Sequence, residues 1–587
     1  MFAKVLVANR GEIALRIFRT LRDMNIASVA VYSDVDRTAV HTLYADEALA
    51  LGGSTSAETY LVVSKLLEAA ERSGAEAVHP GYGFLAENAA FARAVEEAGL
   101  VWIGPPPDAI ELMGSKTRAR QAMQAAGVPI IPGTTDPVGS ADEVVELGDE
   151  IGWPLLIKAA AGGGGKGMKV VRGADEAAQA FESARREGQA YFADASVYVE
   201  RYLEDPRHVE VQVLADSFGN VIHLGERDCT IQRRHQKLVE ETPSPAVGAE
   251  LRSRIGKIAV DAARAAGYRS AGTIEGLLAP DGSYYFMEMN TRIQVEHTIT
   301  EVVAGVDLVR AQVQIAAGER LEFTQDEIRL QGHAIECRIN AEDIANGFLP
   351  SPGTITVYRE PSGPGVRVDS GVTAGSEISP LYDPMIAKLI VRGADREDAI
   401  GRMLRALGEF EIGGVKTLIG FHKALLSHPC FAAGETCHGI VESELLARRA
   451  AELTVEPVAD GGAARGGVER TAVAEVDGRR VSVKVRVPEP PYRALARRRR
   501  ERASAGAGGA GSGLVTSPMQ GTVLDVKVAE GDTVEAGQVV AIVEAMKMEN
   551  EVAAHRAGMI ADVAVSAGEP VTTGQPICSI TDAAPAT

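Results

Sequence analysis

One segment near the C-terminus occurs twice, and this repeat constrains the fold more than any other feature of the chain. The stretch GTVLDVKVAEGDTVEAGQ at 521–538 aligns in register with GMIADVAVSAGEPVTTGQ at 558–575, and Gly, Asp, Val and Gln recur at matching positions. Two copies of one supersecondary unit are expected to pack together and to bury a shared core. The repeat therefore predicts a small all-β flattened barrel or sandwich with internal pseudo-symmetry.

The segment that joins the two copies, VVAIVEAMKMENEV at 539–552, carries one lysine between two methionines. The runs 541–545 and 548–552 are expected to pair as a hairpin, which places Met546 and Lys547 at its turn. A surface lysine in a turn is the simpler interpretation, but Met-Lys lacks the Gly, Asn or Asp that tight turns favour. Two exposed thioethers also have no packing reason to be there. A function for the lysine is therefore favoured.

The N-terminal part of the chain alternates between strand-like and helix-like stretches. Residues 4–8 and 27–32 read as strands on either side of a helical pattern at 12–24, which is the βαβ order of a parallel sheet. Strands around glycine-rich turns follow, and strands and helices mix again over 332–446. We predict an α/β multidomain body over residues 1–446.

Between this body and the repeat the composition changes. A hairpin is predicted within 471–487, around Asp477-Gly478. Four arginines at 497–500 precede an Ala, Gly and Ser stretch at 504–513, which is typical of a flexible tether. An arginine run can bind nucleic acid, but beside a tether in an acidic protein a solvated charge run is the better interpretation.

Charge and cysteine usage exclude several classes of protein. The 587 residues include 60 Lys and Arg against 80 Asp and Glu, and the net charge of -20 argues against a general nucleic-acid binder. No apolar run of ~18 residues is present to span a bilayer, and no signal peptide is recognisable, so we expect a cytoplasmic protein. The five cysteines include no Cys-x-x-Cys pair. We expect buried small apolar residues rather than a disulfide framework or a zinc site.

A run of four glycines lies between two strand-like segments in IKAAAGGGGKGMKVV at 157–171. It is not a P-loop, because Lys166 is followed by Gly167 and a strand rather than by Ser or Thr and a helix. A glycine hairpin can still fold over phosphates and offer backbone N–H groups without obstruction by Cβ. With Lys158 just ahead of the glycines, this segment resembles the ATP-grasp architecture.

A pair of glutamates is brought together by the stretch IEGLLAPDGSYYFMEMN, which predicts a hairpin around its Asp-Gly pair. In that register Glu275 lies directly opposite Glu288. Facing like charges destabilise a sheet, whereas a divalent cation between them removes the repulsion, and Mg²⁺ favours one or two carboxylates with substrate phosphates. We predict a metal site at these glutamates, with Asn290 and Leu277 on the same face.

Together these features resemble the α subunit of a bacterial acyl-CoA carboxylase, in which a biotin carboxylase is joined to a biotin carboxyl carrier domain. The residues EAMKME around Lys547 are similar to the biotinyl-lysine motif of such carriers, whereas a lipoyl domain typically carries its lysine between Asp and Ala. The resemblance covers nearly the whole chain and is strongest over 1–446 and 515–580. Its motifs are ANRGEIA at Ala8, HPGYGFLAEN at His79, ERDCTIQRRHQKLVEE at Glu226, EMNTRIQVEH at Glu288 and GHAIECRINAED at Gly332.

The resemblance implies a role for each matching residue. Lys547 would carry biotin covalently, Glu296 would be the general base, and Arg338 would steady biotin when its ureido group becomes an enolate. The metal ligands for Mg²⁺ or Mn²⁺ would be Glu275, Glu288 and Asn290. Bicarbonate would be held by Lys237, Arg292, Gln294 and Val295. ATP would be surrounded by Lys116, Lys158, Gly162, Gly163, Gly164, Gly165, Lys166, Gly167, Met168, Glu200, Leu203, His208, Gln232, His235 and Leu277.

The spacing of Arg292, Gln294 and Glu296 suits alternate positions of an extended segment, which would put all three on one face. One departure from the family concerns the adenine contact. The usual Thr-Phe-Glu-Phe-Leu is replaced by Thr-Ile-Glu-Gly-Leu at 273–277, with one extra residue in the hairpin turn. Glu275 keeps its place, and the contact of Leu277 with adenine is the weaker expectation.

The resemblance also implies an order of domains. The α/β body would be a biotin carboxylase with an ATP-grasp domain, followed by an all-β biotinyl/lipoyl-like carrier, and the β domain that docks partners in larger carboxylases would be abbreviated. The segments are an N-terminal α/β domain at 1–114, an ATP-grasp domain at 115–331, a C-terminal biotin carboxylase domain at 332–446, a short β linker region at 447–502, a tether at 503–513 and a carrier domain at 514–582.

The function that the resemblance implies is ATP- and bicarbonate-dependent carboxylation of biotin on the chain's own carrier domain. Glu296 would deprotonate bicarbonate, carboxyphosphate would break to CO₂ and phosphate, and phosphate would deprotonate biotin so that N1′ captures CO₂. The product would pass to a separate carboxyltransferase β subunit that carboxylates acetyl-CoA or propionyl-CoA, in a hetero-oligomer. A biotin protein ligase would load the carrier.

Alternative functions remain at this stage. The chain could be mainly a swinging-arm carrier whose front half is a scaffold without ATP-dependent activity. An ATP-grasp ligase that joins an acid to an amine would have no use for Lys547. A pyruvate or urea carboxylase would need an acceptor-side catalytic domain, for which the remaining residues are too few.

Overall fold

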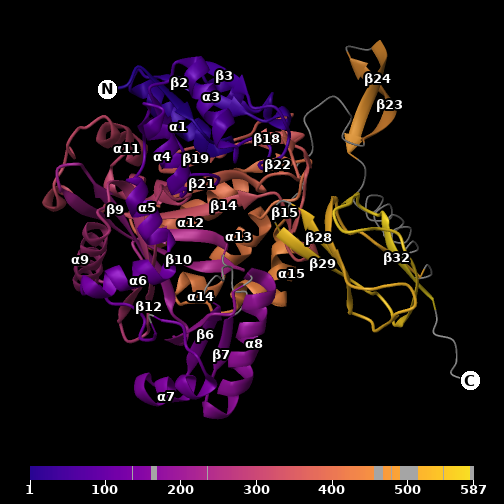
Figure 1. The fold of residues 1–587 in the computed structure, drawn as a ribbon. Coiled ribbons are helices and arrows are strands. Elements are labelled where there is room, and N and C mark those ends of the chain that lie inside the picture. Colours follow the sequence, from indigo (N-terminus) through magenta and orange to yellow (C-terminus); the bar gives the residue numbers. More distant parts are fainter. Residues whose placement is uncertain are drawn as a thin grey trace, which may run out of the picture. The chain divides into compact units, whose positions relative to one another are not determined.

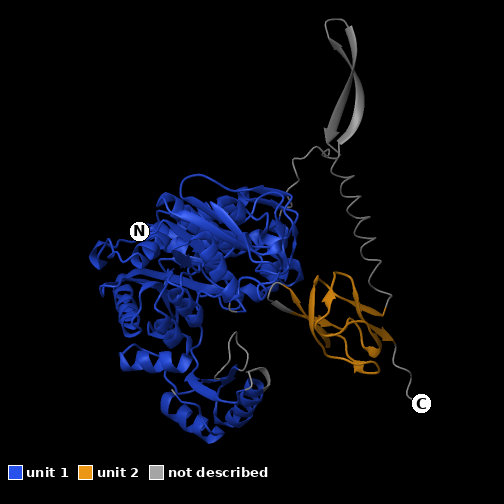
Figure 2. Ribbon diagram, turned by 45° about the horizontal axis from the view of Figure 1, so that its top comes forward, with its two compact units in different colours: residues 1–456 blue, residues 457–587 orange. Residues whose placement is uncertain are grey.

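The computed structural model describes residues 1–134, 136–159, 168–192, 194–234, 236–454, 467–476, 479–488, 513–545 and 548–581. They belong to two compact units, 1–456 and 457–587 (Figure 2). Several predicted features lie outside the described residues, namely Gly162 to Gly167, His235, Asp477-Gly478, the arginines 497–500, the tether residues 503–512, and Met546 with Lys547. Among the helices described, none is both long enough and apolar enough to span a bilayer.

The N-terminal part of unit 1 is a parallel sheet, as predicted. Ile13, Ile17 and Leu21 of helix α1 recur at helical spacing and are buried, so the helix packs on the sheet. Strand β1 pairs in parallel with β2 and with β4. The strand order is β3 (Glu47–Ala50), β2 (Ala27–Tyr32), β1 (Lys4–Val7), β4 (Ala77–His79) and β5 (Val101–Trp102), with helices α1 (Gly11–Asp23), α2 (Val40–Tyr44), α3 (Val63–Ser73), α4 (Ala89–Glu97) and α5 (Pro107–Gly114).

The centre of unit 1 is an eight-stranded antiparallel sheet (Figure 1). The sheet crosses the boundary that the sequence places at residue 331, because β14 pairs with β11. In spatial order its strands are β13 (Tyr284–Asn290), β12 (Ser270–Leu278), β9 (Arg207–Ala215), β10 (Val221–Arg233), β11 (Gln236–Thr242), β14 (His333–Asn340), β21 (Met385–Gly393) and β19 (Val366–Ser370). Its neighbouring helices are α6 (Lys116–Ala125), α9 (Ala249–Ala265), α10 (His297–Ala304), α11 (Leu308–Ala316) and α12 (Arg396–Glu409).

A third, three-stranded sheet carries the glycine segment. Strand β6 (Leu155–Ala159) pairs antiparallel with β7 (Met168–Val171) and with β8 (Val197–Arg201), and helices α7 (Ala141–Ile151) and α8 (Ala174–Phe192) accompany them. The two predicted strands on either side of the glycine segment are confirmed, and the segment itself lies outside the described residues.

The remainder of unit 1 consists of short elements. They are β15 (Glu342–Asp343), β16 (Leu349–Pro350), β17 (Gly353–Thr354), β18 (Val357–Arg359), β20 (Glu377–Ile378), β22 (Glu411–Gly413), α13 (Ile419–Leu426), α14 (Pro429–Ala432) and α15 (Glu444–Leu453).

The cysteine expectation is wrong for one pair. Cys430 and Cys437 form a disulfide, because the chain turns back after α14 and brings their Cα atoms to 5.7 Å. Such a local turn leaves no sign in cysteine spacing. Cys229, Cys337 and Cys578 are free and buried, as expected.

Unit 2 contains the duplicated β unit that the repeat predicts. One four-stranded sheet has the order β25 (Leu514–Thr516), β32 (Pro576–Thr581), β30 (Gly558–Val563) and β27 (Thr533–Val534), and the other has the order β29 (Met548–Ala553), β28 (Val539–Ala545), β26 (Gly521–Val526) and β31 (Pro570–Val571). The copies exchange strands: β27 of the first pairs with β30 of the second, and β31 of the second pairs with β26 of the first. Equivalent valines, Val534 and Val571, are buried in the core.

Two hairpins of unit 2 match the predictions. Strand β28 pairs with β29 and sets Ala545 opposite Met548, so that only Met546 and Lys547 connect the two strands. Strands β23 (Gly467–Val476) and β24 (Arg479–Pro488) pair antiparallel around the predicted Asp-Gly position, and both are longer than expected.

Candidate active site

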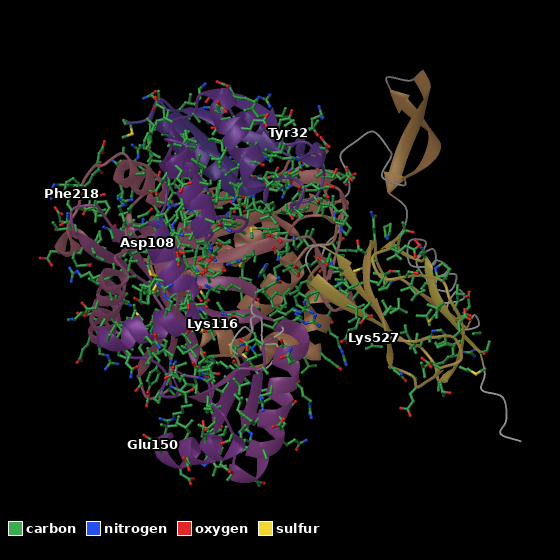
Figure 3. All side chains as sticks on the ribbon, in the orientation of Figure 1. Tyr32, Asp108, Lys116, Glu150, Phe218 and Lys527 are labelled. Atoms are coloured by element: carbon green, nitrogen blue, oxygen red, sulfur yellow. A yellow bond between two sulfur atoms is a disulfide. The ribbon has the colours of Figure 1, made fainter. Side chains whose placement is uncertain are left out.

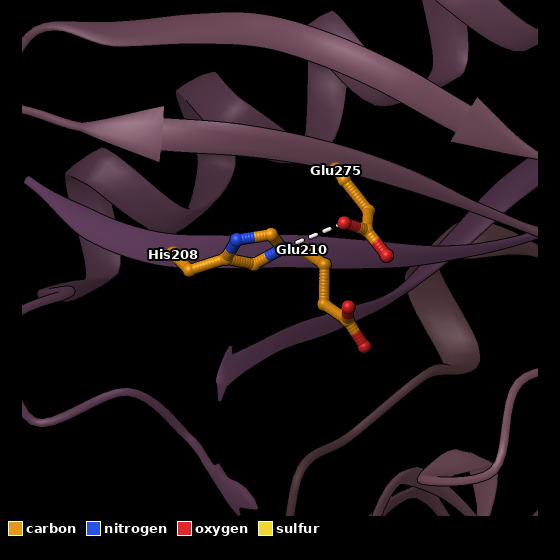
Figure 4. Close-up of side chains that lie close together, drawn as sticks. All are labelled: His208, Glu210 and Glu275. Atoms are coloured by element: carbon orange, nitrogen blue, oxygen red, sulfur yellow. Dashed lines mark hydrogen bonds and ion pairs between the residues drawn. The ribbon is translucent and has the colours of Figure 1, made fainter. Parts of the chain in front are cut away.

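Every second side chain of strand β9 is polar, and these side chains lie on one face of the central sheet. Val209 and Val211 are buried in a core that includes residues of helix α9, so His208 and Glu210 face the opposite side. His208 Nε2 lies 2.7 Å from Glu275 Oε2, and Figure 4 shows both side chains beside Glu210. The polar face therefore gathers imidazole and carboxylate groups at one place.

Lys237 of β11 is surrounded by three buried carboxylates. Its Nζ donates to Glu210 Oε2 at 2.5 Å, to Glu275 Oε1 at 2.9 Å and to Glu296 Oε1 at 2.6 Å. Burial disfavours the ammonium, but Glu210 and Glu296 outweigh burial and raise the pKa of Lys237 well above its usual value. The site thus contains a fixed cation in an acidic setting.

A second fixed cation, Arg227 of β10, lies entirely inside the protein. Its Nε donates to Glu210 Oε1 at 2.5 Å, and its two Nη atoms donate to Thr300, Thr273 and Gln294. The amide oxygen of Gln294 is thereby occupied, which leaves its amide nitrogen to donate to Glu275 Oε1 at 2.6 Å. Arg227 therefore determines how Gln294 presents its amide.

The predicted pairing of Glu275 with Glu288 is confirmed. The register differs closer to the turn, where a β-bulge next to Met287 pairs Gly276 with Phe286 and Leu277 with Tyr285. The extra residue of the hairpin is accommodated in this bulge. Leu277 still lies on the same face as Glu275, as predicted, because the two residues pair with His208 and Glu210 of β9.

The two paired carboxylates differ in their environments. Burial opposes the charge of Glu275, but Lys237 and His208 outweigh burial and hold its pKa well below the usual range. Glu288 is exposed over more than a third of its surface, and partial desolvation together with the charge of Glu275 raises its pKa. Asn290 completes the set by donating to Glu275 Oε1 at 2.6 Å.

These groups fit a hard divalent cation. Glu275 and Glu288 supply carboxylate oxygens from facing positions and Asn290 supplies an amide oxygen, which are the donor types that Mg²⁺ prefers. A further set of potential ligands, His208, Glu210 and Glu275, has donor atoms within 4.8 Å of one another. Glu275 belongs to both sets, and the predicted set adds Glu288, whose side chain is exposed, whereas Glu210 is completely buried against Lys237 and Arg227.

The segment 291–296 is not the extended strand that the alternating spacing suggests. It leaves β13 through bends and ends in a turn at Val295, and Glu296 is the N-cap residue of α10. Arg292 donates to Glu87 Oε2 and to Asn290 Oδ1, both at 2.9 Å. Strand alternation therefore does not explain how the Glu296 side chain is placed relative to those of Arg292 and Gln294.

The backbone of this segment is held by a buried lysine instead. Lys388 of β21 is completely buried and donates to the Val295 carbonyl at 2.9 Å. Its Nζ also lies 3.3 Å from Glu12 Oε2. Burial raises the pKa of Glu12 to about 7, in spite of Lys388.

Arg338 of β14 connects two carboxylates. Its Nε donates to Glu240 Oε1 at 2.6 Å and its Nη2 donates to Glu296 Oε2 at 2.8 Å. Burial disfavours the charge of Glu296, but Lys237 and Arg338 outweigh burial and hold the pKa of Glu296 well below its usual range. Lys237, Glu296 and Arg338 thus form one chain of alternating charge.

The residues predicted to surround ATP lie in several elements of unit 1. Lys158 donates to Glu200 Oε2, and Arg120 Nη1 donates to Glu200 Oε1 at 2.9 Å. Lys116, labelled in Figure 3, begins helix α6, which Ser115 caps. Met168 begins β7, Leu203 follows β8, His208 and Leu277 pair across β9 and β12, and Gln232 lies near the end of β10.

A cavity of about 240 Å³ lies beside Gln232. Its other lining residues come from β10, from the loop between β8 and β9, and from the segment that contains Cys437, which the disulfide ties to Cys430. Among the described residues that were predicted to surround ATP, only Gln232 lines this cavity.

Sequence reasoning missed four charged residues of the site: Glu210, Arg227 and Glu240, which are buried, and Glu87, which is exposed. A signal existed for the first, because His208, Glu210 and Gln212 alternate with three valines in RHVEVQV. Glu87, which accepts from the Thr291 amide at 3.0 Å, lies within the HPGYGFLAEN motif. Arg227 and Glu240 lie within the motif ERDCTIQRRHQKLVEE, but their partners Glu210 and Arg338 come from other strands.

Four segments of the chain match known protein families. Residues 1–110 match the family described as "Biotin carboxylase, N-terminal domain" and 336–443 match "Biotin carboxylase C-terminal domain". Residues 115–324 match "Carbamoyl-phosphate synthase L chain, ATP binding domain", and 513–580 match "Biotin-requiring enzyme".

Two curated relatives and one solved structure illustrate the similarity. The chain is 48% identical to the biotin-dependent acyl-coenzyme A carboxylase alpha3 subunit of Mycobacterium leprae, over 98% of each chain. It is 55% identical to a pyruvate carboxylase subunit of Methanothermobacter thermautotrophicus, over 74% of this chain and 88% of the relative. The biotin carboxylase domain of Hydrogenobacter thermophilus 2-oxoglutarate carboxylase, solved with MgADP, ADP and bicarbonate, matches with a TM-score of 0.71 and 48% identity, over 76% of this chain and 99% of that one.

Proposed function

The chain belongs to the family of biotin-dependent acyl-CoA carboxylase α subunits and is an ATP-dependent biotin carboxylase with its own biotin carrier domain, and from that premise we propose roles for its residues and an acceptor for its product. The observation that carries the assignment of roles is the charge chain in which Lys237 touches Glu210, Glu275 and Glu296, and Glu296 touches Arg338. It connects the predicted metal, bicarbonate and biotin sites.

Glu296 is proposed as the base that accepts the bicarbonate proton. Contact with Lys237 and Arg338 keeps it ionised and makes it a weak base. A bicarbonate anion held by Lys237 and Arg292 brings a negative charge beside Glu296 and competes for the same ammonium, and both effects raise the basicity of the carboxylate. The base therefore gains strength when its substrate is present.

Bicarbonate is proposed to bind where cations and amide donors converge. Lys237 supplies an ammonium, Gln294 an amide that Arg227 orients, and Arg292 a guanidinium held by Glu87. Positioning bicarbonate against the γ-phosphate of ATP lowers the entropic part of the barrier. Lys388 contributes by fixing the Val295 carbonyl immediately before the base.

Glu275, Glu288 and Asn290 would hold Mg²⁺, which neutralises phosphate charge when it is bound. Lys116, Lys158, Glu200 and His208, with the glycine segment, would hold the nucleotide. The contacts of Lys158 and Arg120 with Glu200 keep two cations on the three-stranded sheet that carries the glycine segment, which suits recognition of anionic phosphates.

Glu288→Gln is expected to lower the apparent affinity for Mg²⁺ in bicarbonate-dependent ATP cleavage. Loss of a residue that only hydrogen-bonds to a metal ligand typically lowers metal affinity ~10–100-fold. Loss of an oxygen ligand itself should lower the affinity at least as much. The measurement is the rate of phosphate release as Mg²⁺ is titrated. Asp281→Asn, which makes the same charge change in the exposed turn of this hairpin, should match the wild type. An unchanged Mg²⁺ dependence in Glu288→Gln would contradict the assignment.

An acyl-CoA, namely acetyl-CoA or propionyl-CoA, is proposed as the final acceptor, with a separate carboxyltransferase β subunit as partner and a biotin protein ligase to load the carrier. The full-length match to an acyl-CoA carboxylase α subunit supports this. The region between the family matches, 444–512, is too small for an acceptor-side catalytic domain. A pyruvate carboxylase made of separate subunits would not need that domain in this chain, and a pyruvate carboxylase subunit of Methanothermobacter thermautotrophicus is similar over 74% of the chain.

The acceptor can be tested with radiolabelled bicarbonate, ATP and Mg²⁺. The loaded chain alone is expected to form acid-labile carboxybiotin and no labelled acyl-CoA, since enolate stabilisation needs a site of its own. Adding a candidate β subunit should move label into an acid-stable acyl-CoA product. Acid-stable label from this chain alone would contradict the need for a partner, and label in pyruvate but in no acyl-CoA would contradict the acceptor. A scaffold without ATP-dependent activity would show no bicarbonate-dependent ATP cleavage with free biotin.

A further inference from the structure

Two glutamates next to Arg338 face each other across the central sheet. Glu240 of β11 lies directly opposite Glu336 of β14, and both are completely buried. Two ionised carboxylates at directly opposed positions repel each other and destabilise a sheet. Because both carboxylates are shielded from bulk solvent, their repulsion is weakly screened, and a second factor is needed to neutralise the pair.

The hydrogen bonds of these glutamates leave one oxygen of each without a donor. Glu240 Oε1 accepts from Arg338 Nε at 2.6 Å, and Glu336 Oε2 accepts from the Thr298 hydroxyl. Glu240 Oε2 and Glu336 Oε1 are buried and have no hydrogen-bond partner among the described residues. Buried oxygen atoms without a partner are costly. A single proton bound between the two carboxyl groups would satisfy both oxygens and remove one negative charge.

The surrounding charges agree with one retained proton. Burial is the largest influence on both groups, and it raises the pKa of Glu240 to about 7 and the pKa of Glu336 well above its usual range. The charge of Glu240 also raises the pKa of Glu336 and the charge of Glu296 raises the pKa of Glu240, whereas Arg338 lowers the pKa of both. The charged and titratable groups that act on the pair are Arg338, Glu296, Lys237, Lys388, Cys229 and Cys337.

We propose that Glu240 and Glu336 share one proton across the β11–β14 pair and, through this arrangement, act as positioning residues for Arg338. This inference rests on the proposed role of Arg338 in holding biotin. Ionised Glu240 holds Nε of the guanidinium while Nη2 reaches Glu296, and the protonated partner Glu336 keeps Glu240 in place. Loss of the shared proton would put two anions beside Arg338 and draw it away from Glu296.

The first experiment measures coupling, the ratio of carboxybiotin formed to phosphate released, with free biotin. Glu240→Gln removes the charge that holds Nε, so coupling is expected to fall at least about tenfold, as for a lost charge-assisted hydrogen bond. ATP cleavage should persist, because Lys237 and Glu296 are unchanged. The KM for biotin should rise and the KM for ATP should not.

The second experiment follows coupling against pH. Above the pKa of the pair the wild type loses the shared proton, so its coupling is expected to decline as pH rises through 7 and beyond. Glu336→Gln has no proton to lose, and its coupling should stay constant over the same range. The matched control is Glu342→Gln, which removes another buried glutamate whose pKa burial raises to about 7, bonded to Asn340 rather than to Arg338. Its profile should follow the wild type.

Infrared spectroscopy tests the shared proton without relying on activity. The carbonyl band of a protonated carboxyl group should be lost in Glu336→Gln relative to the wild type at neutral pH. No loss of that band would overturn the shared proton, as would equal pH profiles in the wild type and Glu336→Gln. Unchanged coupling in Glu240→Gln would overturn the positioning role. A wild type with no carboxybiotin formation would instead contradict the proposed function, and the infrared result would still stand.

Discussion

Glu296→Gln is expected to reduce bicarbonate-dependent ATP cleavage by about 10²–10⁴-fold, the usual contribution of a general base. The substitution keeps the size of the side chain and its contacts with Lys237 and Arg338 in part, but the amide cannot accept the bicarbonate proton. Bicarbonate that keeps its proton is a poor nucleophile toward the γ-phosphate of ATP. The measurement is phosphate release with and without bicarbonate, at saturating ATP and Mg²⁺.

Arg338→Gln is the informative comparison, because it removes the other end of the same ion pair. Since Arg338 is proposed to act on biotin, this variant should keep part of the ATP cleavage and lose coupling to carboxybiotin. Both substitutions remove the ion pair between Glu296 and Arg338, so a role limited to holding the fold would give the same defect in both. Equal losses of cleavage and of coupling in the two variants would refute separate roles.

Lys547→Arg is expected to abolish biotin attachment and, with it, all transfer of carboxyl groups to a partner. The observed pairing of Ala545 with Met548 leaves only Met546 and Lys547 to connect β28 and β29. A lysine at the end of a hairpin presents its amine to a modifying enzyme, and arginine keeps the charge but lacks a reactive amine. Intact-mass measurement after expression with an active biotin ligase gives the result directly.

The matched control for this experiment is Lys527→Arg, in the same unit. Lys527 contacts Asp525, and its side chain is 48% exposed. This variant should carry biotin like the wild type. ATP cleavage with free biotin should continue in Lys547→Arg, because unit 1 keeps all of its proposed active-site residues. Biotin found on Lys547→Arg at the wild-type level would disprove the attachment site.

The sequence was sufficient where structure depends on local counting. The pairing of Glu275 with Glu288 follows from a turn position and the regular alternation of a hairpin, and it is confirmed. The β-bulge that shifts the register after Glu275 was not predictable, because no residue pattern marks it. The parallel sheet and the duplicated β unit were predictable, since their patterns repeat over short distances.

The sequence was insufficient where a contact joins distant strands. Glu240 and Glu336 are far apart in the chain, and only the pairing of β11 with β14 makes them neighbours. Glu210 and Arg227 likewise become partners through the pairing of β9 with β10. The turn at Glu296 was missed because its alternation with Arg292 and Gln294 fits a strand equally well. Residue spacing does not predict these contacts, because they depend on how all the strands of the sheet pair.

The exchange of strands in unit 2 has a consequence for how this part of the chain forms. Neither copy of the repeat completes a sheet alone, because β27 of the first and β31 of the second each lie in the sheet of the other copy. A single copy would expose strand edges and half of the core, so it would behave as one protomer of an obligate dimer. The unit thus resembles two protomers joined covalently, and its sheets can be complete only after the last strand, β32, has been synthesised.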